Sequence, residues 1–314
     1  MSAAAHVITE IASQPECWTR AAELADSVAD RLPHPGERVA VVGCGTSYCM
    51  ARAYAALREA AGLGETDAYP ASEVALGRRY DRIVAITRSG TTTEVLRLLG
   101  TVAGRVPTLA VTGVRTAPVT HRADAVIDLG FADEQSVLQT RFATTALQLL
   151  RAGLGTDLTL SIADGELAVA EPLPHSWRER RQFTFLGSGW TTGLADEAAF
   201  KLREAARAWT ESYAAMEYRH GPITVSDRSS LVWAFGDPPA GLEDEVATTG
   251  ALFTADALDP VASLVRAQRL AVELAARRGM NPDRPRHLSR SVILAREPVR
   301  VLGGAADRAA AGRT

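Results

Sequence analysis

Short runs of apolar, β-branched residues alternate along this chain with longer segments in which apolar residues recur at helical spacing. A continuous apolar run is typical of a strand buried on both faces. Its alternation with helices is typical of a parallel sheet covered on both sides. The pattern therefore predicts an α/β fold. In the first part of the chain the expected strands are 37–43, 66–71, 82–87, 107–113 and 125–130, and the expected helices are 46–61, 94–104 and 136–154.

The same pattern begins again after a weaker, proline-containing segment at 155–175, which we interpret as a connection between two halves. VVGCGTSY and LREA in the first half match FLGSGWTT and LREA in the second, and Gly43 and Gly187 are 144 positions apart (187 minus 43). We therefore expect a duplication, with ligands held at the carboxyl ends of the strands. The strands expected in the second part are 183–187, 230–236 and 250–256, and the helices are 191–208 and 260–278.

The segment 83–94, IVAITRSGTTTE, ends an apolar run in a turn rich in hydroxyl groups around Gly90. A strand that stops there and restarts as a helix directs free backbone N–H groups and the positive end of the helix dipole at one point. One or two hydroxyls would suit an ordinary helix N-cap, but a larger number predicts a phosphate site. Five are present: Thr87, Ser89, Thr91, Thr92 and Thr93.

A second turn of this kind follows the first predicted strand, where the sequence GCGTS places Thr46 and Ser47 between strand and helix. The two glycines also form part of a dinucleotide fingerprint, with Asp67 about 20 residues further on, but the third glycine is missing. We interpret the turn as a further contact for a phosphosugar and keep NAD binding as the weaker alternative.

Three charged residues share one face of the predicted helix 191–208, because Glu197, Lys201 and Glu204 are spaced i, i+4 and i+7. A solvated stripe of salt bridges has the same spacing. Since the helix follows a glycine-rich turn, we instead expect these groups to divide acid, base and electrostatic roles at a pocket. His220, ahead of a Gly-Pro turn, is a candidate to transfer protons near neutral pH, with a structural role as the alternative.

Composition narrows the class of protein. The chain has 314 residues, 46% of them hydrophobic, which suits a globular protein with a large core. The net charge is -3 and the basic residues are scattered, so the sequence does not predict a basic surface that would bind nucleic acid. The N-terminus lacks signal-peptide features, and no apolar run approaches the ~20 residues that cross a bilayer. Three cysteines and six dispersed histidines lack metal-ligand spacing. We expect a cytoplasmic protein with no metal and no membrane partner.

Together these segments resemble the sugar isomerase (SIS) family of phosphosugar-binding proteins. They are most similar to the isomerase half of glucosamine-6-phosphate synthase and to the tagatose-6-phosphate ketose/aldose isomerase type. The resemblance extends through nearly the whole chain. Its segments are TEIASQP (9–15), CGTSY (44–48), TRSGTT (87–92), FLGSG (185–189), EAAFKLRE (197–204), ESYAAMEYRHGP (211–222) and DRPRHLSRSV (283–292).

The resemblance implies a particular organisation of the chain: two tandem, flavodoxin-like SIS domains, each a three-layer αβα sandwich around a parallel sheet. We expect an N-terminal helical segment at 1–34, a first domain at 35–155, a connection at 156–176, a second domain at 177–298 and a C-terminal tail at 299–314.

The resemblance also implies an activity, the aldose–ketose isomerisation of a sugar phosphate by ring opening and proton transfer between C1 and C2, without a cofactor. Glu204 would move the proton with support from Lys201, and His220 would assist ring opening from the partner subunit of a homodimer. The substrate would be held by Thr46, Ser47, Thr87, Arg88, Ser89, Thr92, Glu197 and Arg290.

Departures from the synthase pattern leave alternatives open. Arg88 and Thr91 replace a Gln and a Glu of the phosphate loop, and Arg290 stands where the synthase has a lysine of its sugar pocket. Because arginine stays protonated and is not nucleophilic, we do not expect a Schiff base there. The alternatives are deamination of a hexosamine 6-phosphate alongside isomerisation, a sulfonated or carboxylated sugar bound through Arg88, and a non-catalytic phosphosugar sensor. Glu204 and His220 together favour an enzyme.

Overall fold

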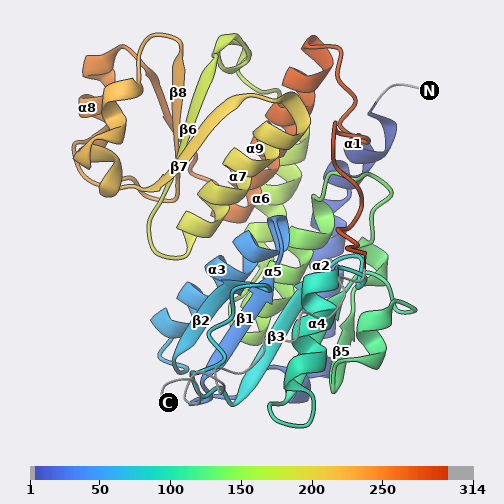
Figure 1. The fold of residues 1–314 in the computed structure, drawn as a ribbon. Coiled ribbons are helices and arrows are strands. Elements are labelled where there is room, and N and C mark those ends of the chain that lie inside the picture. The colour runs from blue at the N-terminus through green and yellow to red at the C-terminus, as the bar shows by residue number, and fades with distance from the viewer. Residues whose placement is uncertain (1–3, 296–314) are drawn as a thin grey trace, which may run out of the picture.

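The computed structural model describes residues 4–295, which form two stacked α/β halves (Figure 1). Each half contains one parallel sheet, of five strands in the first and four in the second. The α/β fold with two parallel sheets, predicted from the hydrophobic pattern, is thereby confirmed. Among the described residues, no helix combines the length and apolar character needed to cross a membrane.

The first sheet has the strand order β2-β1-β3-β4-β5. Successive residues of its central strands point to opposite faces, so that Val39 and Val41 enter the core shared with the second half, whereas Ala40 and Val42 pack under a separate helix. The elements of this half are β1 (Val39–Gly43), α3 (Thr46–Ala60), β2 (Thr66–Pro70), β3 (Arg82–Thr87), α4 (Thr93–Val102), β4 (Thr108–Thr112), β5 (Ala125–Asp128) and α5 (Arg141–Gly153), with short 3₁₀ turns at Pro118–His121 and Gly130–Ala132.

The second sheet has the order β7-β6-β8-β9, which repeats the first four positions of the first sheet. Phe183 and Phe185 point to the shared core, and Leu186 points to the opposite, smaller cluster. The elements are β6 (Gln182–Gly187), α7 (Thr191–Ala206), β7 (Trp209–Ala214), β8 (Ser230–Phe235), α8 (Leu242–Thr249), β9 (Leu252–Ala255) and α9 (Pro260–Arg277), with 3₁₀ turns at Glu217–His220 and Pro222–Val225.

The predicted duplication is visible in the turns after β1 and β6. A Cβ on Gly43 would lie 2.5 Å from the carbonyl carbon of Ser47, and a Cβ on Gly187 would lie 2.4 Å from that of Thr191. In both turns the helix therefore starts against the end of the strand, where only glycine fits. Gly45 and Gly189 share the same left-handed φ of 56°.

Helices outside the two repeats join the halves. Trp18 packs in the shared core and donates its indole N–H to Thr144 at 3.0 Å, and Gln14 donates to Gln268 at 2.7 Å. The segment predicted as a connection forms a helix that packs against α9 and the N-terminal helices. These elements are α1 (Ala5–Ala12), α2 (Gln14–Ala25), the 3₁₀ turn Asp26–Arg31, α6 (Thr159–Ala170) and the 3₁₀ turn His175–Glu179. The domain boundaries remain a prediction, and the expected tail at 299–314 lies outside the described residues.

The structure corrects three local predictions. The helix expected from Ser136 begins at Arg141, because the Glu134 carboxylate accepts from the backbone N–H groups of Thr140 and Arg141 and so caps the helix there. Strand β7 occupies part of a segment considered only for its chemistry, and the short helix α8 was not predicted.

Helices α3 and α7 meet at the junction of the two halves (Figure 1). Gly193 of α7 lies directly on α3, where an added Cβ would come within 2.6 Å of the Cys49 carbonyl oxygen and 2.8 Å of the Ala53 nitrogen. Arg52 of α3 and Asp196 of α7 form an ion pair at the same junction. The close approach of the two helices therefore depends on a residue without a side chain.

We expect Gly193→Ala to lower the free energy of unfolding by about 1–3 kcal/mol, because the added methyl group overpacks this junction. Urea denaturation measures the change. The matched control is Gly100→Ala in α4, where the only atom near an added Cβ is the flexible end of Arg122, 3.1 Å away. Since alanine favours helices, the control should keep or gain stability. Equal stability of the two variants would contradict the close packing of α3 and α7.

Candidate active site

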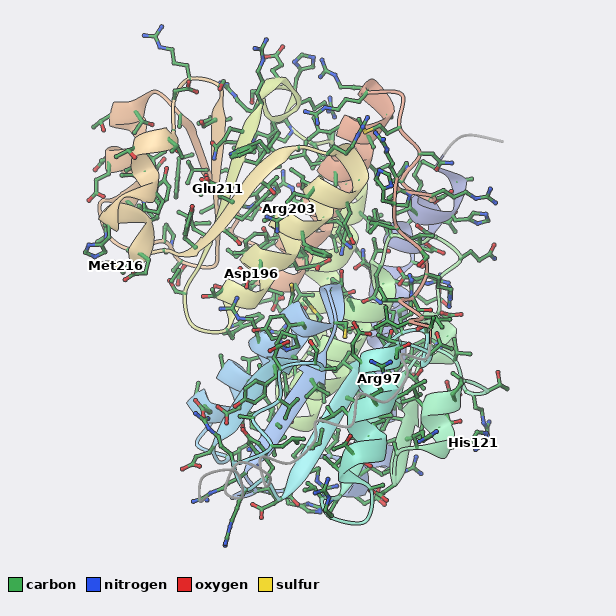
Figure 2. All side chains as sticks on the ribbon, viewed as in Figure 1. Arg97, His121, Asp196, Arg203, Glu211 and Met216 are labelled. Carbon is green, nitrogen blue, oxygen red and sulfur yellow. The ribbon has the colours of Figure 1, made fainter. Side chains whose placement is uncertain are left out.

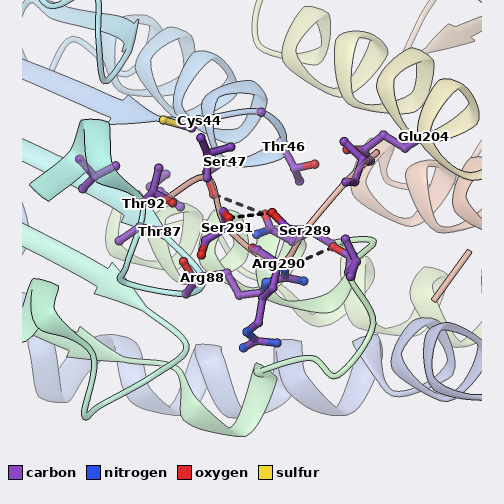
Figure 3. A pocket seen from close by; sticks show the side chains of 18 of the residues that line it. Cys44, Thr46, Ser47, Thr87, Arg88, Thr92, Glu204, Ser289, Arg290 and Ser291 are labelled. Carbon is purple, nitrogen blue, oxygen red and sulfur yellow. Dashed lines mark hydrogen bonds between the residues drawn. The ribbon is translucent and has the colours of Figure 1, made fainter. Parts of the chain in front are cut away.

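A cavity of about 210 Å³ lies where the carboxyl ends of β1 and β3 face α7 of the second half (Figure 3). Its walls come from five parts of the chain: the turn after β1, the end of β3 with the turn and helix start that follow it, the segment ahead of α5, the C-terminal part of α7 and the segment 288–292. The predicted residues that line it are Thr46, Ser47, Thr87, Arg88, Ser89, Thr92, Glu204 and Arg290.

The hydroxyl-rich turn after β3 forms one end of this cavity. Gly90 has a left-handed φ of 62°, and a Cβ there would lie 2.5 Å from the Cβ of Ala117, so the tight turn requires glycine. The side chains of Thr87 and Ser89 are buried in the wall. The turn leads into the N-terminus of α4, which directs the positive end of the helix dipole at the cavity. This end is suited to an anion.

The turn after β1 supplies a second set of hydroxyl groups. Ser47 lies in the first turn of α3 and donates to the amide oxygen of Gln139 at 3.3 Å. Thr46 accepts a hydrogen bond at 3.2 Å from the Lys201 ammonium group of the other half. The turn therefore contributes both to the cavity wall and to the contact between the two halves.

Glu204 lies at the end of the cavity opposite Thr87 and Thr92 (Figure 3). Its carboxylate oxygen is 3.0 Å from the Lys201 nitrogen, and the side chain keeps 18% of its surface exposed. Lys201 also lies 3.1 Å from a carboxylate oxygen of Glu197, and the side chains of Lys201 and Glu197 are completely buried. The three residues that share a helix face thus form one ion cluster, with only Glu204 on the cavity wall.

Burial and mutual charge set the protonation of this cluster. Burial raises the pKa of Glu197 from 4.5 to about 7, despite the opposing effect of the Lys201 charge. Burial acts to lower the pKa of Lys201, but Glu197 and Glu204 on either side outweigh it and leave that pKa above its ordinary value. Lys201 is therefore a fixed cation that holds Glu204, and Glu197 acts through Lys201 rather than on a ligand. The expected direct contact of Glu197 with the substrate is not supported.

The side chain of Arg88 does not point its charge at the cavity. Its guanidinium donates to the carbonyl oxygens of Ser136 at 3.0 Å and Arg290 at 3.1 Å, and it lies 3.5 Å from the buried Glu134 carboxylate. Since these acceptors occupy the guanidinium, the alternative in which Arg88 grips a sulfonate or carboxylate sugar is not supported. Arg88 thereby holds the backbone at Ser136 and Arg290 in place.

The polar C-terminal segment lines one side of the cavity with residues 288–292. The Val292 carbonyl accepts from the backbone N–H of Thr93 at 3.1 Å, and Ser291 accepts from the Thr91 hydroxyl at 2.9 Å. Arg290 forms an ion pair with Asp133, so its charge is already balanced. Sequence reasoning did not single out the other wall residues as site residues. Among them, Cys44, Phe200, Ser289 and Ser291 lie within the quoted segments 44–48, 197–204 and 283–292, and Gln139 lies just ahead of α5.

His220 lies apart from the cavity described above. It is exposed, in the 3₁₀ turn that follows Met216, and Met216 lies at the outer edge of the second half (Figure 2). Within a single chain the structure therefore does not bring His220 and Glu204 together. This arrangement leaves the predicted role of His220 dependent on a second subunit.

Comparison with known proteins adds to this picture. No protein-family model matches the chain. A curated relative is the glutamine–fructose-6-phosphate aminotransferase [isomerizing] of Pyrobaculum aerophilum. It is 26% identical in an alignment 350 residues long, which covers 92% of this chain and 57% of the relative. The chain thus spans little more than half of that protein.

Solved structures of phosphosugar enzymes have the same fold. Glucosamine-6-phosphate deaminase from Thermotoga maritima superposes with a TM-score of 0.74 at 24% identity, covering 91% of this chain and 99% of that one. Tagatose-6-phosphate ketose/aldose isomerase from Escherichia coli gives 0.73 at 16% identity, covering 92% and 96%. The predicted resemblance to SIS phosphosugar isomerases is confirmed, and so is the fold class.

We expect the raised pKa of Glu197 to make stability depend on pH. A carboxyl group with a higher pKa in the folded state binds its proton more tightly when folded, so its contribution to stability is full below pH 4.5 and is lost as the pH rises through about 7. Glu197→Gln should not show this loss. The free energy of unfolding of wild type minus that of the variant should therefore fall between pH 4.5 and 7.

Urea denaturation across this pH range measures the difference. Glu243→Gln, at an exposed position of α8, is the matched control and should parallel wild type. A Glu197→Gln curve parallel to wild type would show that the buried carboxyl group does not titrate in this range.

Proposed function

We propose that this protein is a sugar-phosphate isomerase that interconverts an aldose and a ketose 6-phosphate. The observation that carries the proposal is the pairing, in one cavity, of a hydroxyl-lined anion site with a carboxylate at the opposite end (Figure 3). An open-chain sugar with phosphate at one end and a carbonyl at the other has this polarity. The deaminase and isomerase names among the similar proteins support the same class.

The phosphate group binds at the turn after β3. Ser47, Thr87, Ser89 and Thr92 donate hydrogen bonds to its oxygens, and the α4 dipole adds attraction without a mobile counter-charge. Binding energy from the phosphate positions the distant carbonyl group beside Glu204, which is how a remote group contributes to the rate of reaction elsewhere in the substrate.

Glu204 moves a proton between C1 and C2. In the carboxylate form it removes the proton from the carbon next to the carbonyl group, which gives a cis-enediolate. A proton then passes from the neighbouring hydroxyl to the former carbonyl oxygen, and Glu204 returns its own proton to the former carbonyl carbon. Lys201, held at 3.0 Å, fixes the orientation of the carboxylate. No net oxidation occurs, because one carbonyl carbon is reduced as its neighbour is oxidised.

His220 assists ring opening from a partner subunit in our proposal. The residue is exposed, and two large apolar side chains near it in sequence, Met216 and Val225, are 52% and 54% exposed. This surface would be buried in a homodimer whose two sites each borrow a histidine. All three cysteines are free thiols, which is in keeping with a reducing, cytoplasmic location.

An assay with a panel of hexose and hexosamine 6-phosphates tests the function. Interconversion of aldose and ketose without ammonia would assign simple isomerisation, and ammonia release from an aminosugar would assign the deaminating branch. Binding of these sugars without turnover of any would instead identify a phosphosugar sensor and overturn the proposed reaction.

We expect Glu204→Gln to lower kcat by about 10²–10⁴, because a positioned general base contributes that much. The amide keeps the shape of the side chain, so calorimetry should show hexose 6-phosphate binding within about threefold of wild type. Glu243→Gln serves again as the exposed control and should leave kcat unchanged. Full activity of Glu204→Gln would remove this residue from the mechanism.

A mixing experiment tests the shared site. Glu204→Gln and His220→Asn subunits, each inactive alone, should regain about a quarter of wild-type activity when co-expressed. Half of the randomly formed dimers are then mixed, and each mixed dimer has one intact site of two. Activity no greater than that of the separate variants would show that His220 does not act across a subunit boundary.

A further inference from the structure

A second cavity, of about 310 Å³, has Glu204 in common with the candidate active site as a wall residue. Its walls come from the C-terminal end of α7 and from the segment that follows α9. Glu204 lines both cavities. The other residues used here are Arg207, Met280, Asn281, Arg284 and Arg286.

The second cavity is rich in unbalanced positive charge. Arg207, Arg284 and Arg286 are exposed at its wall. Within residues 4–295, no carboxylate lies within 4.0 Å of their side-chain nitrogens, whereas Arg88 and Arg290 of the first cavity are both ion-paired. Arg207 contacts only the weakly accepting sulfur of Met280, at 3.5 Å. Exposed guanidinium groups without a carboxylate partner are suited to bind an anion.

Arg207 occupies a position where glycine is the usual residue. It ends α7 with φ 49° and ψ 38°, in the left-handed region. A Gly at this position would relieve the backbone, so the arginine adopts this conformation at a local cost. The position offers a way to delete one guanidinium group while favouring the observed backbone.

The order of the groups along the two cavities indicates what the second one holds. In the first cavity Glu204 lies at the end opposite Thr87 and Thr92 (Figure 3). The arginines line the second cavity, whose one wall residue in common with the first is Glu204. Since Glu204 faces the C1–C2 end of the sugar in the proposed function, a group in the second cavity must be attached at that end. An unsubstituted hexose 6-phosphate would leave the cavity unused.

We propose that the substrate carries an anionic substituent on C1 or C2, of which a carboxylate joined through the amino nitrogen of an aminosugar phosphate is the simplest form. This inference rests on the proposed function for the direction in which the sugar lies. Phosphate binds at the hydroxyl-rich turn, and the carboxylate binds among Arg207, Arg284 and Arg286. The protein would then select a doubly anionic sugar over a plain hexose phosphate.

Two isosteric probes isolate the charge. One is 1-amino-1-deoxyfructose 6-phosphate with an N-carboxymethyl group, and the other carries an N-carbamoylmethyl group in its place. Calorimetry in the Glu204→Gln background prevents turnover. We expect the carboxylate probe to bind about tenfold more tightly than the amide probe. A hydrogen bond to a charged group is stronger than a neutral one by a free energy that corresponds to about a factor of ten in affinity. The difference should shrink with added salt.

We test the arginines with three substitutions in the Glu204→Gln background, made singly and together: Arg207→Gly, Arg284→Ala and Arg286→Ala. They should bring the affinities for the carboxylate and the amide probe together. The affinity for fructose 6-phosphate should stay unchanged. Arg97→Ala is the matched control: Arg97 is an exposed arginine on α4 (Figure 2) that lines neither cavity, and the variant should keep the tenfold ratio.

The outcomes separate the two proposals. Equal binding of carboxylate and amide, with fructose 6-phosphate still bound, would overturn the second anion site and leave the proposed function standing. A tenfold charge preference that depends on the arginines, in a protein whose wild type turns over no sugar phosphate, would support the site and overturn the isomerase reaction. Failure of all three ligands to bind would overturn both.

Discussion

The arrangement of the site depends on one buried cation. Lys201 of α7 is surrounded by Glu197, Glu204 and the hydroxyl of Thr46, at 3.1, 3.0 and 3.2 Å. Removing a charge from water is costly unless partners replace the lost hydration, and here the partners come from both halves of the molecule. Thr46 belongs to the turn that follows β1, so the ion cluster links the orientation of Glu204 to the walls of the anion site. The close packing of α3 on α7 at Gly193 makes this contact possible.

A second charge network holds the opposite wall. Glu134 caps α5 with one carboxylate oxygen and faces Arg88 with the other, and Arg88 holds the backbone at Ser136 and Arg290. The phosphate turn, the start of α5 and the C-terminal segment are thereby fixed to one another through a single guanidinium. Arg88, which in the sequence resembles an anion ligand, therefore has a structural role in holding these segments together. In the proposed function, the hydroxyl groups and the helix terminus remain available for the anion.

The two halves have the same topology and different tasks. Both begin with a strand, a glycine turn and a helix, and both turns use glycine at φ 56°. After β3 the first half carries the hydroxyl-rich turn, whereas the equivalent strand β8 leads into Gly-Asp-Pro-Pro. The second half instead carries the ion cluster on α7. In the proposed function, the anion therefore binds at one half, and the carboxylate that transfers the proton belongs to the other. A cavity between them needs both.

The sequence alone determined the α/β class, the repeat, the strand-turn-helix positions of the two hydroxyl turns and the shared helix face of Glu197, Lys201 and Glu204, because each depends on residues close together in the chain. It could not place β7, whose polar residues lack the apolar run of a central strand, or the start of α5, which depends on the Glu134 cap. Only the tertiary structure decided that Arg88 faces Glu134 and that Glu197 contacts Lys201 without lining the cavity. It also decided that His220 lies outside the cavity of its own chain. The three arginines of the second cavity, at 207, 284 and 286, are likewise brought together only by the fold. Each of these contacts depends on which distant segments pack against one another, and the local hydrophobic periodicity does not predict that packing.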